Sequence, residues 1–378
     1  MAIYKDIVKK IPISAEKKTK QKQYLSCGVL PIIDQGHQII GGYTDDISKK
    51  IDCDLPVIVF GDHTRCVKLI KFAFAPGADG IKVVRPVDNS VLIEYLFYAT
   101  KYLTTKIRDK GYARHYQDVE KQELEIPTVL KQKEIVLKLE KDLSSLDNAV
   151  ETLNKTKEQL AVYRQAVLKE AFGKFTKKKR IKEVSNFVTS GSRGWAKYYS
   201  GTGARFIRIT DLTRDGITLK DDNVQHVKLP ENAEGKRSRL KGNDVLVSIT
   251  ADLGSIALIP ENIQEAYINQ HIAMIRFNIS VQGKFMAWYL KSDYGQKDLL
   301  KNKRGGGKLG LGLDDIRDTL VPIVDNEEAM MTVNQIDARL SACDNIENLI
   351  DIIQKQAEAM RQSILKEAFE GRLVCCQQ

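Results

Sequence analysis

The chain has few of the residues that mark a metal site, a secreted protein or a membrane segment. It has no run of eighteen apolar residues, so no segment is predicted to span a bilayer. Its six cysteines form no C-x-x-C pair and no metal-ligand spacing, which argues against a zinc ribbon. The N-terminal residues lack the basic-then-apolar order of a secretory signal. We therefore expect a reduced, cytoplasmic protein without a bound metal.

Motifs of nucleotide-binding and hydrolytic enzymes are also absent. The chain has no G-x-x-x-x-G-K-[ST] phosphate loop, no H-E-x-x-H, no nucleophile elbow and no Pro-Pro of the kind that amino-methyltransferases use. One glycine-rich loop is present, Lys303–Lys308, followed by Gly310 and Gly312. It follows no strand of a βαβ unit, which argues against a dinucleotide site. Two interpretations remain open, a basic loop that lies along phosphates and a solvated connection.

Positive charge is in excess over negative charge. The chain has 59 Lys and Arg against 49 Asp and Glu, which gives a net charge of +10 and a pI of about 9.1. A polyanionic partner is therefore favoured. Nucleic acid fits better than a membrane surface, because a basic membrane binder would also need an apolar anchor.

An internal repeat organises the sequence. The pentapeptide Leu-Lys-Glu-Ala-Phe occurs at Leu168–Phe172 and at Leu365–Phe369, and the offset of 197 residues holds without a gap for more than thirty residues upstream. The matching pairs are Leu143/Leu340, Ser144/Ser341, Asp147/Asp344, Asn148/Asn345, Gln159/Gln356, Arg164/Arg361 and Gln165/Gln362. Each copy closes a long segment without Gly or Pro. The chain is therefore a globule followed by a helix, and this half occurs twice.

The two long helices are predicted at Lys131–Phe172 and Glu327–Phe369. Their apolar residues recur at the 4-3 spacing of a coiled coil over about four heptads. The residues expected to pair the helices are Leu139, Leu143, Leu146, Val150, Leu153, Leu160, Ile336, Leu340, Ile350 and Ile364. Polar residues interrupt both seams at equivalent positions and are expected to fix register; they are Lys157, Arg164, Gln354 and Arg361. A neighbouring stripe in the second helix is broad enough for an additional partner helix and consists of Ile346, Leu349, Ile353 and Met360.

Each globule is predicted to be a mixed α/β domain. In the first, Leu55–Phe60 and Ile81–Val84 are apolar runs typical of buried strands, and Leu92–Thr105 is typical of a helix. The second globule follows the same order at offsets of about 190 residues, with Asp244–Thr250, His271–Arg276 and Phe285–Leu290. The side chains differ almost everywhere else, which indicates similar frames for different targets.

The order globule, helix, globule, helix predicts how the helices pair. If the first helix runs from one globule to the other, the second must return in the opposite direction. The fold class is therefore α+β, with two mixed α/β domains separated by a pair of long antiparallel coiled-coil helices and a pseudo-twofold internal repeat. Some 40 residues at about 1.5 Å each give a helix of roughly 60 Å. The predicted segments are a first domain (1–127), a central helix (128–174), a second domain (175–322), a C-terminal helix (323–373) and a tail (374–378).

Candidate base-reading residues lie where predicted strands end. They are His63, Thr64 and Arg65 in the first globule and Ser248, Thr250, Asn269, Gln270 and His271 in the second. His63 and Arg65 are both able to donate to guanine acceptors in a major groove, where a good bidentate contact discriminates by about 1–3 kcal/mol. A turn of ordinary surface residues explains the first set about as well.

Basic residues supply candidate phosphate contacts. In the second globule, Arg193 and Lys197 interleave with Tyr198 and Tyr199, a mixture that suits nucleic acid more than a protein partner. Any single basic cluster is more often a solvated face. The full candidate set is Lys17, Lys20, Arg193, Lys197, Arg205, Arg208, Arg237, Arg239, Lys303, Arg304 and Lys308.

Several stretches resemble the specificity subunits of Type I restriction-modification systems. The repeated helix ends, Arg164–Phe172 and Arg361–Leu373, resemble those of the family, as do Ile126-Pro127 and Val321-Pro322 at the helix entries. The globules resemble two different groups of the family's target recognition domains. The stretches are Tyr24–Gly36, Gly41–Asp45 and Val59–Arg65 in the first, and Ser190-Gly191, Arg205–Leu212 and Asp244–Thr250 in the second. The resemblance covers essentially the full chain and rests on order and duplication together.

The resemblance implies a DNA-recognition subunit that is not catalytic by itself. In that family each globule reads one half of a split double-stranded DNA target, and the helices set the gap. The helices also dock two methyltransferase subunits, which restriction subunits with motor activity join. S-adenosylmethionine and ATP are then expected on the partner subunits, with no cofactor on this chain. Because the globules differ, the two half-sites are expected to differ.

Two alternatives remain at the level of sequence. One is a non-enzymatic coiled-coil scaffold whose globules bind proteins; weak DNA affinity without sequence preference would support it. The other is an enzyme that works alone through an unrecognised site. The absence of any paired nucleophile and base at a known spacing argues against that enzyme.

Overall fold

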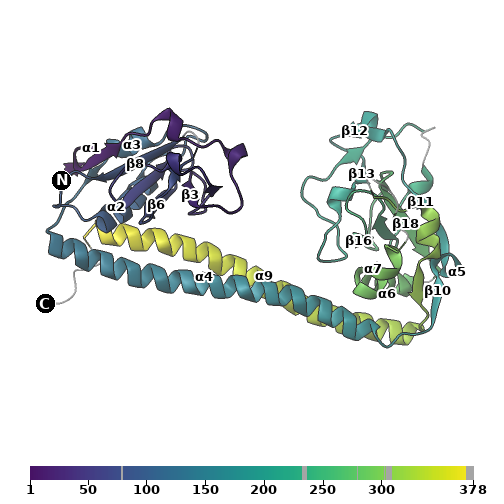
Figure 1. Ribbon diagram of the computed structural model, residues 1–378. Coiled ribbons are helices and arrows are strands. Elements are labelled where there is room, and N and C mark those ends of the chain that lie inside the picture. The colour runs from purple at the N-terminus through teal and green to yellow at the C-terminus, as the bar shows by residue number, and fades with distance from the viewer. Residues whose placement is uncertain (78–79, 232–235, 279, 302, 304–308, 372–378) are drawn as a thin grey trace. The chain divides into compact units, whose positions relative to one another are not determined.

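The computed structural model describes residues 1–77, 80–231, 236–278, 280–301, 303 and 309–371 (Figure 1). The chain divides into two compact units. Unit 1 is Met1–Asn154 with Asp351–Gln378, and unit 2 is Lys155–Ile350. Each unit holds one mixed α/β domain and a part of each long helix. The predicted bounds of the five segments stay a prediction.

Unit 1 is built on an antiparallel sheet of four strands in the order β2-β8-β5-β6. These strands span Val8–Ile11, Ile81–Pro86, Val57–Gly61 and Val67–Ile70. A smaller sheet has the order β4-β3-β7, in which β3 and β7 are parallel, and spans Gly42–Thr44, Leu30–Ile33 and Ala75–Pro76. The short strands β1 and β9 pair antiparallel over Ala2–Ile3 and Glu123–Leu124. The helices are α1 (Tyr4–Ile7), α2 (Ile93–Lys106) and α3 (Tyr116–Glu120).

Strand β5 reads as an unbroken apolar run because both of its faces are buried. Ile58 and Phe60 belong to a core that includes Tyr95 and Leu96 of α2. Val57 and Val59, which alternate with Ile58 and Phe60, belong to a second core on the opposite face, with Ile33 and Phe74. Successive side chains of a strand point to opposite faces, so a strand between two cores is apolar throughout. The strands and the helix predicted in this globule are confirmed, with bounds shifted by at most two residues.

Unit 2 repeats this topology. Its main antiparallel sheet has the order β11-β18-β15-β16 and spans Ser185–Ser190, Ile272–Phe277, Val245–Ser248 and Ile256–Leu258. The second sheet, β12-β14-β13-β17, has β13 and β17 parallel and spans Tyr199–Ser200, His226–Val227, Ala204–Ile207 and Ala266–Ile268. Strands β10 and β19 pair antiparallel over Lys178–Arg180 and Leu320–Pro322. The helices are α5 (Ile181–Val184), α6 (Ser280–Lys291), α7 (Asp293–Leu299) and α8 (Leu313–Asp318).

The long helices are α4, Val129–Phe172, and α9, Asn326–Phe369 (Figure 1). Cross-helix contacts in each unit show that they run antiparallel. In unit 1, Arg361 donates to Asp147, and Gln354 Nε2 lies 2.7 Å from Asn154 Oδ1. In unit 2, Arg164 Nη2 lies 2.6 Å from Asp344 Oδ1 and 2.9 Å from Glu347 Oε2, and Arg339 Nη1 lies 2.8 Å from Glu170 Oε2. Partner numbers fall on one helix as they rise on the other.

The ion pairs obey the internal repeat. Adding 197 to Arg164 gives Arg361, and adding 197 to Asp147 gives Asp344, so the pairs Arg164–Asp344 and Arg361–Asp147 are copies of each other. Of the predicted polar interruptions, Arg164, Gln354 and Arg361 thus hydrogen-bond across the helices. All of the residues predicted to pair the helices are buried or half-buried. The predicted fold class, with its paired helices and internal repeat, is confirmed.

The repeated pentapeptide ends each helix inside a domain core. In unit 2, the ring of Phe172 lies 5.3 Å from that of Phe285 in α6. In unit 1, the ring of Phe369 lies 5.3 Å from that of Tyr102 in α2, and the two rings are stacked. Leu168 and Leu365, the first residues of the two copies, are both buried. In both domains the Leu, Ala and Phe of the pentapeptide pack on the core and hold the helix end, whereas its Lys and Glu are exposed.

Candidate nucleic-acid interface

In unit 1, the turn after β5 is fixed by Asp62, whose side chain is almost fully buried. The amide of Asp62 donates to Gly80 O at 2.6 Å, and its carbonyl accepts from His115 N at 2.9 Å. Its carboxylate oxygen Oδ1 accepts from Tyr116 N at 2.9 Å. These bonds tie the turn to the segment before α3 and leave the next three residues, His63, Thr64 and Arg65, half-buried at the surface.

The candidate residues of this turn contact a loop that the sequence reasoning missed. The ring of His63 stacks on Tyr112 with centroids 4.2 Å apart and an interplanar angle of 5°. Arg65 has a left-handed φ of 60°, and its Nη2 lies 2.6 Å from Asp109 Oδ2. Thr64 Oγ1 donates to Gln35 O at 2.5 Å. The signal that points to this loop is the placement of basic residues and a tyrosine at every second position over 108–114.

In unit 2, the residues around the turn after β15 come together on His271. Thr250 Oγ1 lies 2.7 Å from His271 Nδ1, and Gln270 Nε2 lies 2.8 Å from His271 Nε2. Asn269 Oδ1 accepts from the amide of His271 at 3.1 Å. Four of the five predicted residues thus form one hydrogen-bonded cluster. Ser248 is fully buried and instead supports the turn, because its hydroxyl donates to Asp252 O and accepts from Ser255 N.

An ion pair lies on the same turn of unit 2. Arg214 makes two hydrogen bonds with Asp252, Nη2 to Oδ1 at 2.8 Å and Nε to Oδ2 at 3.2 Å. The Arg214 hydrogen bond holds the pKa of Asp252 below its usual range, although burial acts in the opposite direction. The member of the pair that lies on the turn is therefore a carboxylate, Asp252, in unit 2 and an arginine, Arg65, in unit 1.

The candidate phosphate contacts fall into two groups. Arg205 Nη2 donates to Lys220 O at 2.6 Å, and Arg208 Nη2 donates to Asn223 O at 2.9 Å, so both brace the loop 220–223. Lys17 Nζ donates to Lys50 O at 2.8 Å. The second group consists of candidates with exposed side chains, namely Lys20, Arg193, Lys197, Arg237, Arg239 and Lys303. Arg304 and Lys308 lie outside the described residues.

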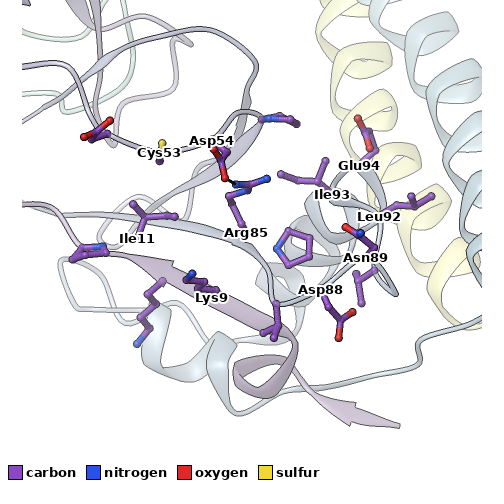
Figure 2. A pocket seen from close by; sticks show the side chains of 17 residues that line it. Lys9, Ile11, Cys53, Asp54, Arg85, Asp88, Asn89, Leu92, Ile93 and Glu94 are labelled. Carbon is purple, nitrogen blue, oxygen red and sulfur yellow. Dashed lines mark hydrogen bonds and ion pairs between the residues drawn. The ribbon is translucent and has the colours of Figure 1, made fainter.

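The described residues hold a sizeable cavity in unit 1, of about 890 Å³, that none of the candidate residues lines. It is bounded by the loop 52–56, the end of β8 and the start of α2. Figure 2 shows its wall, where Arg85 Nη1 lies 2.8 Å from Asp54 Oδ2. The remaining charged lining groups are of both signs and include Lys9, Asp88 and Glu94.

The described part of the chain shows neither a metal site nor a membrane-spanning helix. No group of three His, Cys, Asp or Glu side chains there is placed to hold a metal ion. Within the same residues, no helix is both long and apolar enough to cross a membrane. The described cysteines, Cys27, Cys53, Cys66 and Cys343, are free thiols.

The second domain and most of α9 match a known family. Residues 174–359 match the family model of the Type I restriction modification DNA specificity domain. This part of the chain therefore belongs to that family, and the resemblance inferred from the sequence is confirmed.

Two curated relatives are specificity subunits of Type I restriction enzymes. The EcoBI subunit of Escherichia coli is 25% identical over 283 residues, which cover 66% of this chain and 58% of that protein. The MjaVIII subunit of Methanocaldococcus jannaschii is 24% identical over 310 residues, covering 74% of this chain and 70% of that protein. The match thus spans less than two thirds of the Escherichia coli protein.

Two solved structures share the fold. A chain from a structure that describes complex assembly and conformational transition of the type I R-M system has a TM-score of 0.70 at 17% identity, covering 94% of this chain and 91% of that one. The HsdS subunit from Thermoanaerobacter tengcongensis has a TM-score of 0.51 at 16% identity, covering 98% of this chain and 96% of that one.

Proposed function

We propose that the chain is the DNA sequence-recognition subunit of a Type I restriction-modification assembly, and that it reads a bipartite, asymmetric target. Each domain reads one half-site. The observation that carries this proposal is the repeated strand order with unlike side chains on equivalent turns. One turn carries His63 and Arg65, and the other carries Thr250 and Asp252, with the charges of the ion pair reversed. Arginine matches guanine acceptors and a carboxylate matches the cytosine amino group, so different half-sites follow.

The rest of the chain supports duplex binding over a long footprint. The net charge of +10 favours a polyanion. Helices α4 and α9 have 44 residues each, so each is about 66 Å long. A duplex rises by about 3.4 Å per base pair. The helices thus set the unspecified gap between the half-sites.

The chain carries no chemistry of its own in this proposal and acts as a scaffold. Two methyltransferase subunits, which modify adenine, dock on the helices, and restriction subunits join them. S-adenosylmethionine and ATP are bound by those partners. An exposed apolar stripe on α9 supports docking: Ile346, Leu349, Ile353 and Met360 are 42%, 57%, 44% and 58% exposed. Apolar side chains in a row on a helix suit burial by a partner.

A selection from a random-sequence duplex library, with the full-length chain as bait, tests the proposal. The recovered duplexes should share two unlike short motifs at a constant separation. Binding without any shared motif, and with low affinity, would instead support a scaffold whose domains bind proteins. Methyl transfer by the isolated chain would show that it is an enzyme and overturn the proposal.

A further inference from the structure

The loop over residues 107–115 of unit 1 packs on the turn that carries Arg65. It connects α2 to α3, and its last residue, His115, donates its amide to Asp62 O at 2.9 Å. The ring nitrogen Nδ1 of His63 lies 3.0 Å from Ala113 O. The turn and the loop thus form one surface, although about fifty residues separate them in the chain.

In unit 2, the described residues 309–312 have the same topological place. They come after α6 and α7 and before α8 in the chain, as the 107–115 loop comes after α2 and before α3. Leu311 donates its amide to Ile249 O at 2.9 Å, just as His115 donates to Asp62 O. Thr250 and Gly310 form an antiparallel bridge. In both units, therefore, the residues just before the short helix (α3 in unit 1, α8 in unit 2) lie against the turn that follows β5 or β15.

The side chains of the 107–115 loop alternate in a way that suits a nucleic acid. Arg108, Lys110, Tyr112 and Arg114 are all exposed, and they occupy every second position. Gly111 has a φ of 66°, which glycine adopts without strain, and it makes the bend before the tyrosine. Tyr112 is 84% exposed even though one face of its ring is stacked on His63. His63 therefore supports one face of the Tyr112 ring, and the rest of the ring is exposed.

Asp109 is the one acidic residue among these cations. Its Oδ2 accepts from Arg65 Nη2 at 2.6 Å, and its Oδ1 accepts from Gly111 N at 2.8 Å. A single carboxylate thus fixes both the guanidinium on the turn and the bend that carries Tyr112. A carboxylate near phosphates is repelled by them, so its role here is to hold these groups in place.

We propose that the 107–115 loop is a second DNA-contacting loop of the first domain, in which Tyr112 touches the duplex and Asp109 positions Arg65. This inference rests on the proposed function. Arg65 is the contact residue and Asp109 acts through it. Holding the guanidinium in one geometry before binding favours a bidentate contact to a single base over random contacts with phosphates.

Competition binding with the full-length chain tests this, using duplexes recovered from the random library and versions scrambled in one half-site. Asp109→Asn should lower the preference for the intact first half-site by about tenfold. Affinity for a fully scrambled duplex should hold or rise, because a negative charge is removed. The double variant Asp109→Asn with Arg65→Ala should lose no more preference than Arg65→Ala alone. Tyr112→Ala should weaken binding of the first half-site, and Tyr112→Phe should not.

A matched control is available in the same domain. Asp54 pairs with Arg85 at 2.8 Å as Asp109 pairs with Arg65, at the cavity wall in Figure 2. Asp54→Asn should leave the preference unchanged. If Asp109→Asn and Tyr112→Ala bind like the wild type, or if Asp109→Asn weakens all duplexes equally, the loop proposal is wrong. If the wild type itself shows no preference for any motif, it is the proposed function that fails.

Discussion

Arg65, which we propose reads a base, is held in place by its neighbours. Its left-handed backbone and its bond to Asp109 hold the guanidinium near the surface, with 30% of the side chain exposed. In unit 2, His271 is held from both ring nitrogens by Thr250 and Gln270. In each case neighbouring side chains fix the reading group before any ligand arrives, which reduces the entropy that binding must overcome.

Replacing Arg65 with Ala should relax selectivity in one half-site only. The lost contact discriminates by about 1–3 kcal/mol, so the preference at one base should fall by roughly tenfold. His271→Ala is the matched variant and should relax the other half-site. Competition between duplexes altered in one half-site at a time measures both. An equal loss on every duplex would mean that Arg65 contacts phosphate alone.

The sequence predicted the turns but not all of their neighbours. A strand followed by Gly61 and polar residues is a local pattern, so the position of Arg65 could be predicted. Asp109 and Tyr112 reach that turn through tertiary packing over more than forty residues, which no local pattern contains. Ser248 was grouped with the base-reading residues because it follows an apolar run, yet it is buried and holds the turn from within.

Among the elements, the helices were the most predictable. Their bounds were predicted within two residues, because a heptad seam repeats many times in one segment. Two main-sheet strands in each unit, β5 and β8 in unit 1 and β15 and β18 in unit 2, also appeared as apolar runs, whereas β2, β6, β11 and β16 were not predicted. The strands of the smaller sheet were not predicted. β3, β4 and β7 have only two to four residues, and β7 pairs in parallel with a strand far from it in sequence.

The seam should depend on its buried leucines. Leu139 is 0% exposed, and Leu139→Ala should lower the free energy of unfolding by about 2–5 kcal/mol, because it leaves a cavity as well as removing apolar contact. Leu137, two residues away on the same helix, is 67% exposed, and Leu137→Ala should change stability by at most about 0.5 kcal/mol. Denaturant unfolding compares them. Similar losses in both variants would show that Leu139 is not part of a packed seam.

Lengthening both helices tests their role in spacing. Seven residues inserted after Asn154 and seven before Asp351 preserve the heptad pattern and add about 10 Å. The gap between half-sites should widen, by up to about three base pairs at 3.4 Å each. Sequencing of duplexes selected by the variant reads the gap directly. An insertion in an exposed loop serves as the control, and an unchanged gap in the helix variant would rule out the spacer role.

At the scale of the whole molecule, the apolar stripe Ile346, Leu349, Ile353 and Met360 on α9 is exposed in the part of the chain that the structure describes. Leu349→Asp should reduce co-purification of a Type I methyltransferase subunit by about tenfold, because docking would bury a charge. Asn348→Asp introduces the same charge at a neighbouring exposed position and should have little effect. Size-exclusion chromatography of co-expressed proteins gives the readout. If both variants retain the methyltransferase equally, the stripe is not the docking face.

Two unlike reading domains in one chain are the central claim of the proposed function. Genome-wide mapping of methylated adenine, in cells that carry the chain with a methyltransferase partner, tests it most directly. The methylated sites should share one motif made of two different half-sites at a fixed gap. Arg65→Ala should reduce the base preference in one half-site only. A palindromic or continuous motif, or a reduced base preference in both half-sites together, would contradict the proposed function.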